Sequence, residues 1–100
     1  MTGISDKQIN DYLNKYHINH FHRGYMYLMT AIRMQVEETV PRGQMQNLYK
    51  AVAAEHGTKW KWVSTAIHQA LQKADVKMKN NEFIVTAMDE LIFGSADECE

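Results

Sequence analysis

The expected fold follows from the stretch L-Y-K-A-V-A-A-E-H-G-T-K-W-K-W-V-S-T-A-I-H-Q-A-L, residues 48–71. Apolar residues recur at helical spacing on both sides of Gly57, which is a typical C-terminal stop of a helix. They are Met45, Leu48, Val52 and Ala53 in a helix expected over about 44–56, and Val63, Ala66, Ile67, Ala70, Leu71 and Ala74 in a helix expected over about 59–75. Because only Gly57 and Thr58 separate the two helices, their axes are expected to cross steeply.

A connection this short leaves two interpretations open. It is typical of a helix-turn-helix whose second helix lies in the DNA major groove, and it also occurs in plain helical hairpins of ordinary bundles. Ala53 is small where the helices are expected to cross, Gly57 follows it, and Val63 is expected to face the core. This spacing suits a helix-turn-helix and a plain helical hairpin equally well. The polar face of the second helix favours the helix-turn-helix.

The helix expected over 59–75 presents a face suited to DNA. Lysines and a helix amino end suit phosphates, whereas hydroxyl and amide side chains suit base edges. The predicted DNA-binding residues are Lys59, Lys61, Trp62, Ser64, Thr65, His68 and Gln69, and Gln72 shares their face. An exposed indole is uncommon without a partner, which supports an interface role for Trp62. Trp60 is instead expected to be structural, packing against the helix 44–56 or the last helix.

Three further helices complete an all-α bundle of about five helices. Ser5 and Gln8 form a capping-box pattern before a helix that buries Ile9, Tyr12, Leu13 and Tyr16. The next begins near Gly24, buries Tyr25, Leu28, Met29, Ile32 and Val36, and ends before Pro41. The last is expected to be capped by Asn80 or Asn81, to bury Phe83, Ile84, Ala87, Met88, Leu91 and Ile92, and to end at Gly94. Residues 1–94 are expected to form one domain, with the helix-turn-helix over about 44–75 and an acidic tail over 95–100.

Length and composition limit the class of protein. One hundred residues suffice for one core, and 45% hydrophobic with 23% charged residues is ordinary for a globular chain. No apolar run approaches membrane-spanning length, and the N-terminus lacks the pattern of a secretion signal. The single cysteine, Cys99, cannot form an internal disulfide. A reduced, cytoplasmic protein with no membrane partner is therefore expected.

Charge is distributed unevenly along the chain. The net charge is −1, yet residues 56–79 carry five lysines against one aspartate, and residues 80–100 carry six acidic residues with no Lys or Arg. A partner responds mainly to the local field, because salt screens charges beyond about 8–10 Å. The lysine-rich segment therefore keeps double-stranded DNA as a suitable partner.

Catalytic and metal-binding interpretations have little support in the sequence. His17, His20 and His22 form H-x-x-H-x-H, but no cysteine or carboxylate cluster nearby in sequence completes a ligand set. No nucleophile and base arrangement, glycine-rich phosphate loop or paired-carboxylate motif is present. We therefore expect no enzyme activity, no cofactor and no metal.

Four segments resemble one protein family. They are G-Y-M-Y-L-M-T-A-I (24–32), L-Y-K-A-V-A-A-E-H-G-T (48–58), V-S-T-A-I-H-Q-A-L (63–71) and N-N-E-F-I (80–84). In this order, and over roughly residues 9–92, they resemble the C-terminal effector domain of the master sporulation response regulator of spore-forming bacteria. The resemblance implies an all-helical domain whose helix-turn-helix binds promoter DNA, with pairs of domains on tandem sites.

Three departures from the family pattern affect this expectation. The residues that resemble the family include no counterpart of the receiver domain that precedes the module there, so phosphorylation control is not expected. The segment 74–79 is shorter and lacks one family helix. The base-contacting arginines of the family correspond to Thr65 and His68 in this chain. Because arginine on guanine is the commonest specific contact, the family's target sequence is not carried over.

Two classes of function are compared on these grounds. The first is a sequence-specific DNA-binding protein that regulates transcription, supported by the lysine-rich segment and the short turn. The alternative is a helical protein-interaction module that does not bind DNA, supported by the missing arginines and the net charge. The last helix has apolar residues on more than one edge, and its family counterpart takes part in pairing. A weak homodimer, favoured on DNA, is predicted through Phe83, Met88 and Ile92.

Overall fold

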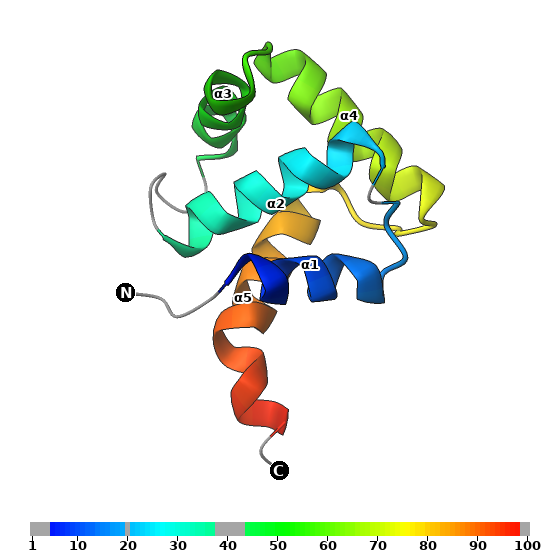
Figure 1. Ribbon diagram of the computed structural model, residues 1–100, viewed down its shortest axis with the longest axis vertical. Helices are drawn as coiled ribbons and strands as arrows, with labels where there is room; N and C mark the ends of the chain where they lie inside the picture. Colours follow the sequence, from blue (N-terminus) through cyan, green and yellow to red (C-terminus); the bar gives the residue numbers. More distant parts are fainter. Residues whose placement is uncertain (1–4, 20, 38–43, 99–100) are drawn as a thin grey trace.

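The described part of the chain folds into five helices without strands (Figure 1). The computed structural model describes residues 5–19, 21–37 and 44–98, with side chains described as far as Ile92. The helices are α1 Asp6–Lys15, α2 Arg23–Val36, α3 Met45–His56, α4 Trp60–Lys73 and α5 Asn80–Glu98. The predicted all-α class is confirmed, and each predicted helix is present.

Helix starts agree with the predictions at α1 and differ at α5. The Ser5 hydroxyl accepts from the N–H of Gln8 at 3.3 Å, while the Gln8 side chain accepts from the N–H of Ser5 at 2.9 Å, which is the predicted capping box. At α5 neither asparagine is the cap. The first helical hydrogen bond is accepted by the carbonyl of Lys79, because both asparagine side chains are engaged elsewhere.

Those asparagine side chains tie the start of α5 to α3 and α4. The Asn80 amide donates to the carbonyl of Ser64 in α4 at 2.9 Å, and the Tyr49 hydroxyl in α3 donates to Asn81 Oδ1 at 3.2 Å. The predicted end of α5 at Gly94 is also wrong, since the helix continues to Glu98. A glycine inside a helix lowers stability by about 1 kcal/mol relative to alanine and ends the helix only where the chain turns away.

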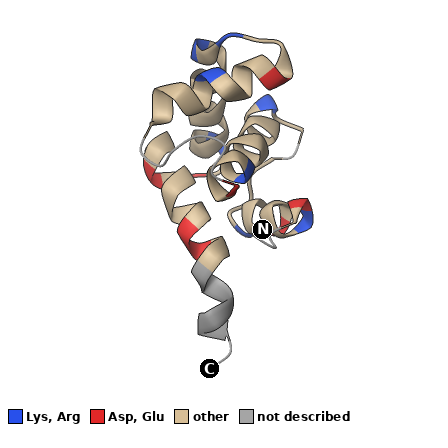
Figure 2. Cartoon of the chain, turned by 90° about the vertical axis from the view of Figure 1, so that its left-hand side faces the viewer, with Lys and Arg blue, Asp and Glu red and all other residues tan. Residues whose placement is uncertain are grey.

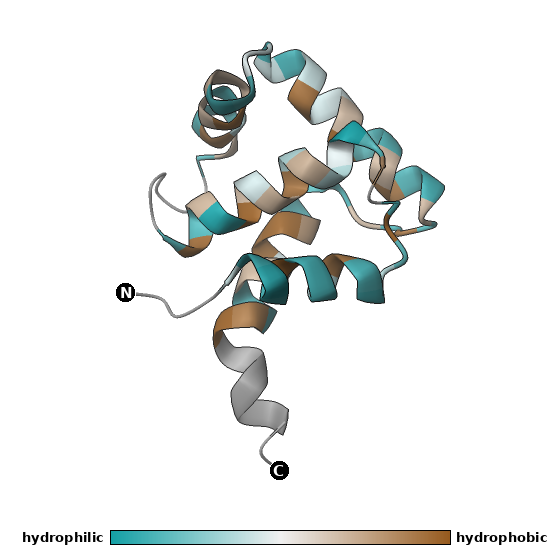
Figure 3. Cartoon of the chain, in the orientation of Figure 1, coloured by the Kyte–Doolittle hydropathy of each residue, from teal (hydrophilic) through white to brown (hydrophobic). Residues whose placement is uncertain are grey.

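Helix α2 is the centre of the core and packs against each of the other four helices. Hydrophobic and hydrophilic residues alternate along the helices at helical spacing (Figure 3). The largest fully buried side chains include Ile9, Leu13, Leu28, Ile32, Leu48, Ile67, Leu71, Phe83, Ile84 and Met88. Most of the residues predicted to face inward are buried. Those that are only partly buried, at the edge of the core, are Tyr16, Met29, Met45, Ala66, Ala74 and Leu91, and Ile92 is exposed.

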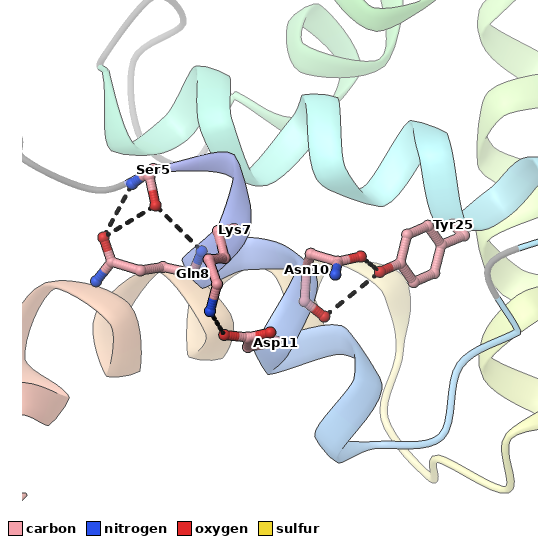
Figure 4. A network of polar contacts seen from close by, with 6 residues as sticks. All are labelled: Ser5, Lys7, Gln8, Asn10, Asp11 and Tyr25. Carbon is pink, nitrogen blue, oxygen red and sulfur yellow. Dashed lines mark hydrogen bonds and ion pairs between the residues drawn. The ribbon is translucent and has the colours of Figure 1, made fainter.

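Polar contacts join α2 to its neighbours. The Tyr25 hydroxyl donates to the side-chain oxygen of Asn10 in α1, beside the capping box and the Lys7–Asp11 ion pair (Figure 4). At the other face, Thr30 Oγ1 and His56 Nε2 of α3 are hydrogen-bonded at 2.8 Å. The contact between Thr30 and His56 holds the C-terminal end of α3 against α2, where the turn into α4 begins.

The stability of the fold is expected to fall as pH rises above about 10. Burial, together with the Tyr16 hydroxyl and the Glu90 carboxylate, raises the pKa of Tyr12 well above its usual value. The unfolded chain therefore loses this proton first, and unfolding is favoured by up to about 1.4 kcal/mol per pH unit above that point. Denaturant titrations at about pH 9 and about pH 11 measure the decline.

Tyr12→Phe should make that decline smaller, because phenylalanine has no hydroxyl to ionise. The decline should not vanish, since burial also raises the pKa values of Tyr25 and Tyr49. An identical decline in the variant and the wild-type protein would contradict a role for Tyr12.

Candidate nucleic-acid interface

The turn between α3 and α4 depends on the conformation of Gly57. Its φ is +67°, a left-handed conformation that costs an L side chain about 1–2 kcal/mol. The N–H groups of Gly57 and Thr58 both donate to the carbonyl of Ala53, the second at 2.9 Å, and this ends α3. Lys59 is extended and α4 begins directly after it. Helices α3 and α4 are thus joined by the short turn 57–59, as the sequence predicts.

One face of α4 is held firmly against the core. Val63, Ile67, Ala70 and Leu71 are buried, and α4 packs on both α2 and α3. At the start of α2, a Cβ atom on Gly24 would lie 2.3 Å from the carbonyl oxygen of Ala66 and 2.7 Å from Cβ of Ala70. The missing side chain at position 24 therefore allows α2 and α4 to approach closely.

The opposite face of α4 is open to solvent and carries the predicted DNA-binding residues. Lys61, Trp62, Thr65, His68, Gln69 and Gln72 are exposed, as is Lys59 directly before the helix. The side chain of Trp62 is 63% exposed, which is unusual for an indole. Ser64 is half-buried and its carbonyl accepts from Asn80, so it lies at the edge of this face.

The two tryptophans of the chain have different environments. Trp60 is half-buried, packs against the core and borders a hollow beside Ala53 and Ala54 of α3. The ammonium of Lys61 lies 6.0 Å from the centre of the Trp60 ring, at the limit of a cation–π contact. This placement agrees with a structural role for Trp60, and it leaves Trp62 as the exposed indole.

The exposed face of α4 forms a ridge between two hollows. The first has a volume of about 580 Å³ and lies between Trp62, Thr65 and Gln69 of α4 and the segment 21–23 that enters α2. The second has a volume of about 820 Å³ and lies between His68 and Gln72 of α4 and the segment 76–82. Thr65 borders both hollows. The sequence did not indicate that segment 21–23 would lie beside α4.

The lysines of α4 and the loop after it are separated from the acidic residues of α5. The exposed lysines of this region are Lys59, Lys61, Lys73, Lys77 and Lys79, whereas α5 carries Glu82, Asp89 and Glu90 on its described side chains and no Lys or Arg (Figure 2). Lys77 lies 4.0 Å from Asp75, and such an exposed pair contributes little to stability. An anionic partner would therefore meet α4 and its flanking loop more favourably than α5.

The histidine-rich segment does not form a metal site in the part of the structure that is described. His22 is the N-cap of α2, because its Nδ1 accepts from the N–H of Gly24 at 3.0 Å. His17 is exposed with a φ of +63° after α1, and His20 lies outside the described residues. Residues 5–19, 21–37 and 44–98 contain no group of three or more His, Cys, Asp or Glu arranged to hold a metal ion.

A match to a protein family agrees with this geometry. Residues 9–90 match the family described as "Sporulation initiation factor Spo0A C terminal". The chain belongs to this family. Members are DNA-binding regulators of sporulation transcription, and the family is not enzymatic. Neither a curated protein nor a solved structure matches the chain.

Membership confirms the resemblance stated from the four sequence segments. The matched range includes all of α2, α3 and α4, together with the turn that joins α3 to α4. Within the described ranges, no helix is both long enough and apolar enough to cross a membrane.

Two of the three residues predicted for dimerisation lie in the core instead of on the surface. Phe83 and Met88 are 0% and 1% exposed. The Phe83 ring packs against Tyr12 of α1 and against Tyr16 directly after that helix, with ring centres 6.1 and 5.4 Å apart. Their assignment to a pairing surface is therefore wrong, because they join α5 to the rest of the domain. Ile92, at 40% exposure, is the predicted residue that remains accessible.

Proposed function

We propose that this protein is a sequence-specific DNA-binding regulator of transcription that places α4 in the major groove. The observation that best supports the proposal is the exposed face of α4, where Trp62, Thr65, His68 and Gln69 lie together while the opposite face is buried. Family membership supports DNA binding in general. An α-helix is about 10–12 Å across and the major groove is about 12 Å wide, so α4 can enter it.

The residues on this face divide into two proposed roles. Lys59 and Lys61, at the amino end of α4, contact phosphates and set the position of the helix. Thr65, His68 and Gln69 contact base edges, because hydroxyl, imidazole and amide groups can both donate and accept. Trp62 supplies an apolar contact at the leading edge, and Ser64 is limited to the border of the interface.

Binding to duplex DNA is expected to weaken steeply as salt increases. Each neutralised phosphate contributes about −0.9 to the slope of log affinity against log salt, and roughly four contacts per domain are expected. Lys61→Ala should weaken binding to all duplexes similarly and reduce the slope by about 1. Fluorescence anisotropy with a random-sequence duplex at two salt concentrations measures both quantities.

Lys7→Ala is the matched control, because it removes the same charge from an exposed position on α1, where Lys7 pairs with Asp11 at 3.2 Å. Its affinity and slope should equal those of the wild-type protein. If the wild-type protein binds no duplex even at about 50 mM salt, the DNA-binding proposal fails. The protein-interaction module would then be the better interpretation of the exposed Trp62 face.

A weak homodimer through the outer part of α5 is also proposed. The C-terminal half of α5 extends beyond the other four helices (Figure 1), and Ile92 is exposed there. Ile92→Glu should reduce self-association on DNA without changing the melting temperature, because this side chain contributes little to the core. Sedimentation velocity with and without a duplex carrying two sites measures the change. Equal association of both proteins on that duplex would contradict pairing through Ile92.

A further inference from the structure

A second strip of residues lies beside the exposed face of α4. Phe21, His22 and Arg23 form the wall of the first hollow opposite Trp62 and Gln69. Figure 1 shows the N-terminal end of α2 next to α4, although the two segments are far apart in sequence. On the other side of α4, Lys77 and Lys79 border the second hollow.

We propose that segment 21–23 contacts the sugar-phosphate backbone of one DNA strand while the loop with Lys77 and Lys79 faces the backbone of the other. This inference rests on the proposed function, in which α4 enters the major groove. A helix that fills the groove has one phosphodiester backbone on each side of it. The two hollows flank α4 in the positions where those backbones would lie.

The first hollow has the charge that a phosphate backbone requires. Arg23 is exposed, and it forms no ion pair within the ranges that the structure describes. None of the residues that border this hollow is an aspartate or glutamate. The planar guanidinium group can donate two parallel hydrogen bonds to a phosphate, which suits arginine to this position.

The cap of α2 adds a second donor to the same wall. His22 Nδ1 accepts from the N–H of Gly24 at 3.0 Å, so the proton of the neutral ring is on Nε2. That N–H is a hydrogen-bond donor on a residue that borders the hollow. The amino end of α2 contributes a partial positive charge in the same direction.

Two aromatic rings give the hollow an apolar component that suits deoxyribose. Phe21 is 93% exposed and Trp62 is 63% exposed, and both border this hollow. Large exposed apolar side chains that gather beside a cation are typical of a binding surface. Since a large share of protein contacts to DNA go to phosphate and sugar, a wall of Arg23 with these rings fits a backbone strand better than an apolar peptide.

The second hollow is expected to bind its strand less strongly. Lys77 and Lys79 border it with His68, but Glu82 borders it too. The Glu82 carboxylate accepts from the N–H of Lys79 at 3.2 Å at the start of α5, and its charge opposes a phosphate. Loss of Lys79 should therefore weaken DNA binding less than loss of Arg23.

Single methylphosphonate substitutions identify the strand that each cation faces. The probe is a duplex selected by the wild-type protein from a random-sequence pool, with one uncharged linkage at a time on either strand. Arg23→Ala should weaken binding to the unmodified duplex roughly tenfold at about 0.1 M salt and reduce the salt slope by about 1. Uncharged linkages at the phosphates that Arg23 contacts should weaken DNA binding by the wild-type protein but not by Arg23→Ala. The linkages that weaken binding by the wild-type protein but not by Lys79→Ala should lie on the opposite strand.

Two further variants separate the proposal from general charge effects. Lys7→Ala should bind like the wild-type protein, and Phe21→Ala should weaken binding while leaving the salt slope unchanged. All of these positions are exposed, so equal melting temperatures are expected and are checked for each variant.

The outcomes are distinguishable. If the wild-type protein selects no duplex, the proposed function itself fails. If it binds but Arg23→Ala behaves like Lys7→Ala, the contact of segment 21–23 with DNA is excluded. If the linkages that matter to Arg23 and Lys79 lie on the same strand, the two-strand arrangement is excluded.

Discussion

Gly24→Ala is expected to destabilise the domain by about 2 kcal/mol and to lower its melting temperature by roughly 8–16 °C. The added Cβ would lie 2.3 Å from the carbonyl oxygen of Ala66, a backbone atom that cannot move without displacing α4. Overpacking of this kind costs about 1–3 kcal/mol or more, and the better helix propensity of alanine offsets about 1 kcal/mol of it. Thermal unfolding followed by circular dichroism measures the change.

The same substitution should weaken DNA binding in the fraction that stays folded. Helices α2 and α4 must separate to admit the methyl group, and this shifts α4 relative to segment 21–23 and the turn at Gly57. Met26→Ala is the matched control, because Met26 is on the same helix and 55% exposed. It should leave both properties almost unchanged. A Gly24→Ala protein that is more stable than the wild-type protein would contradict this prediction. It would show that the gain in helix propensity exceeds the steric cost of the added methyl group.

Helix positions could be predicted from the sequence because they depend on local patterns. The capping box at Ser5 and the left-handed stop at Gly57 are properties of a few neighbouring residues, and both were predicted. The start and end of α5 were not. Asn80 and Asn81 resemble caps in sequence, but their amides are engaged by Ser64 and Tyr49 from other helices. Such tertiary contacts leave no signal in the sequence near the helix end.

The exposed face of α4 was predictable for a related reason. Helical periodicity assigns Val63, Ile67 and Ala70 to one side, and Thr65 and His68 must then lie on the other. The same reasoning failed for α5, where apolar residues occur on more than one edge and periodicity alone cannot say which edge is covered.

The neighbourhood of α4 could not be predicted from periodicity at all. Phe21 and Arg23 lie beside it because Gly24 allows α2 to touch the backbone at Ala66. That contact joins segments more than forty residues apart. The glycine of G-Y-M-Y-L is the one local signal for it, since a glycine near a helix start often marks a close backbone approach.

Thr65→Arg with His68→Arg is expected to raise DNA affinity and to shift sequence preference toward guanine. The two residues are exposed and one helical turn apart on α4, so both can meet neighbouring base pairs when the helix lies in the major groove. Threonine offers a hydroxyl or a methyl group, and a neutral imidazole offers one donor and one acceptor. Neither side chain can form the paired hydrogen bonds that arginine makes with guanine. Each good arginine pair should add about 1–3 kcal/mol of discrimination, or roughly 5- to 150-fold.

A gain in positive charge alone would also raise affinity, and the control variant must exclude that explanation. Gln46→Arg with Ala54→Arg adds the same two charges at exposed positions of α3. Because these two positions lie outside the exposed face of α4, this variant should bind all duplexes more tightly, with a steeper salt slope and no change in sequence preference. Selection from a random-sequence pool is then compared for the wild-type protein and both double variants. The wild-type protein should select weakly defined, A·T-tolerant sites, and guanine should become enriched at adjacent positions with the Thr65→Arg/His68→Arg protein only. If all three proteins select the same sequences, α4 does not contact base edges through these two positions, and their assignment to sequence recognition fails even where binding itself persists.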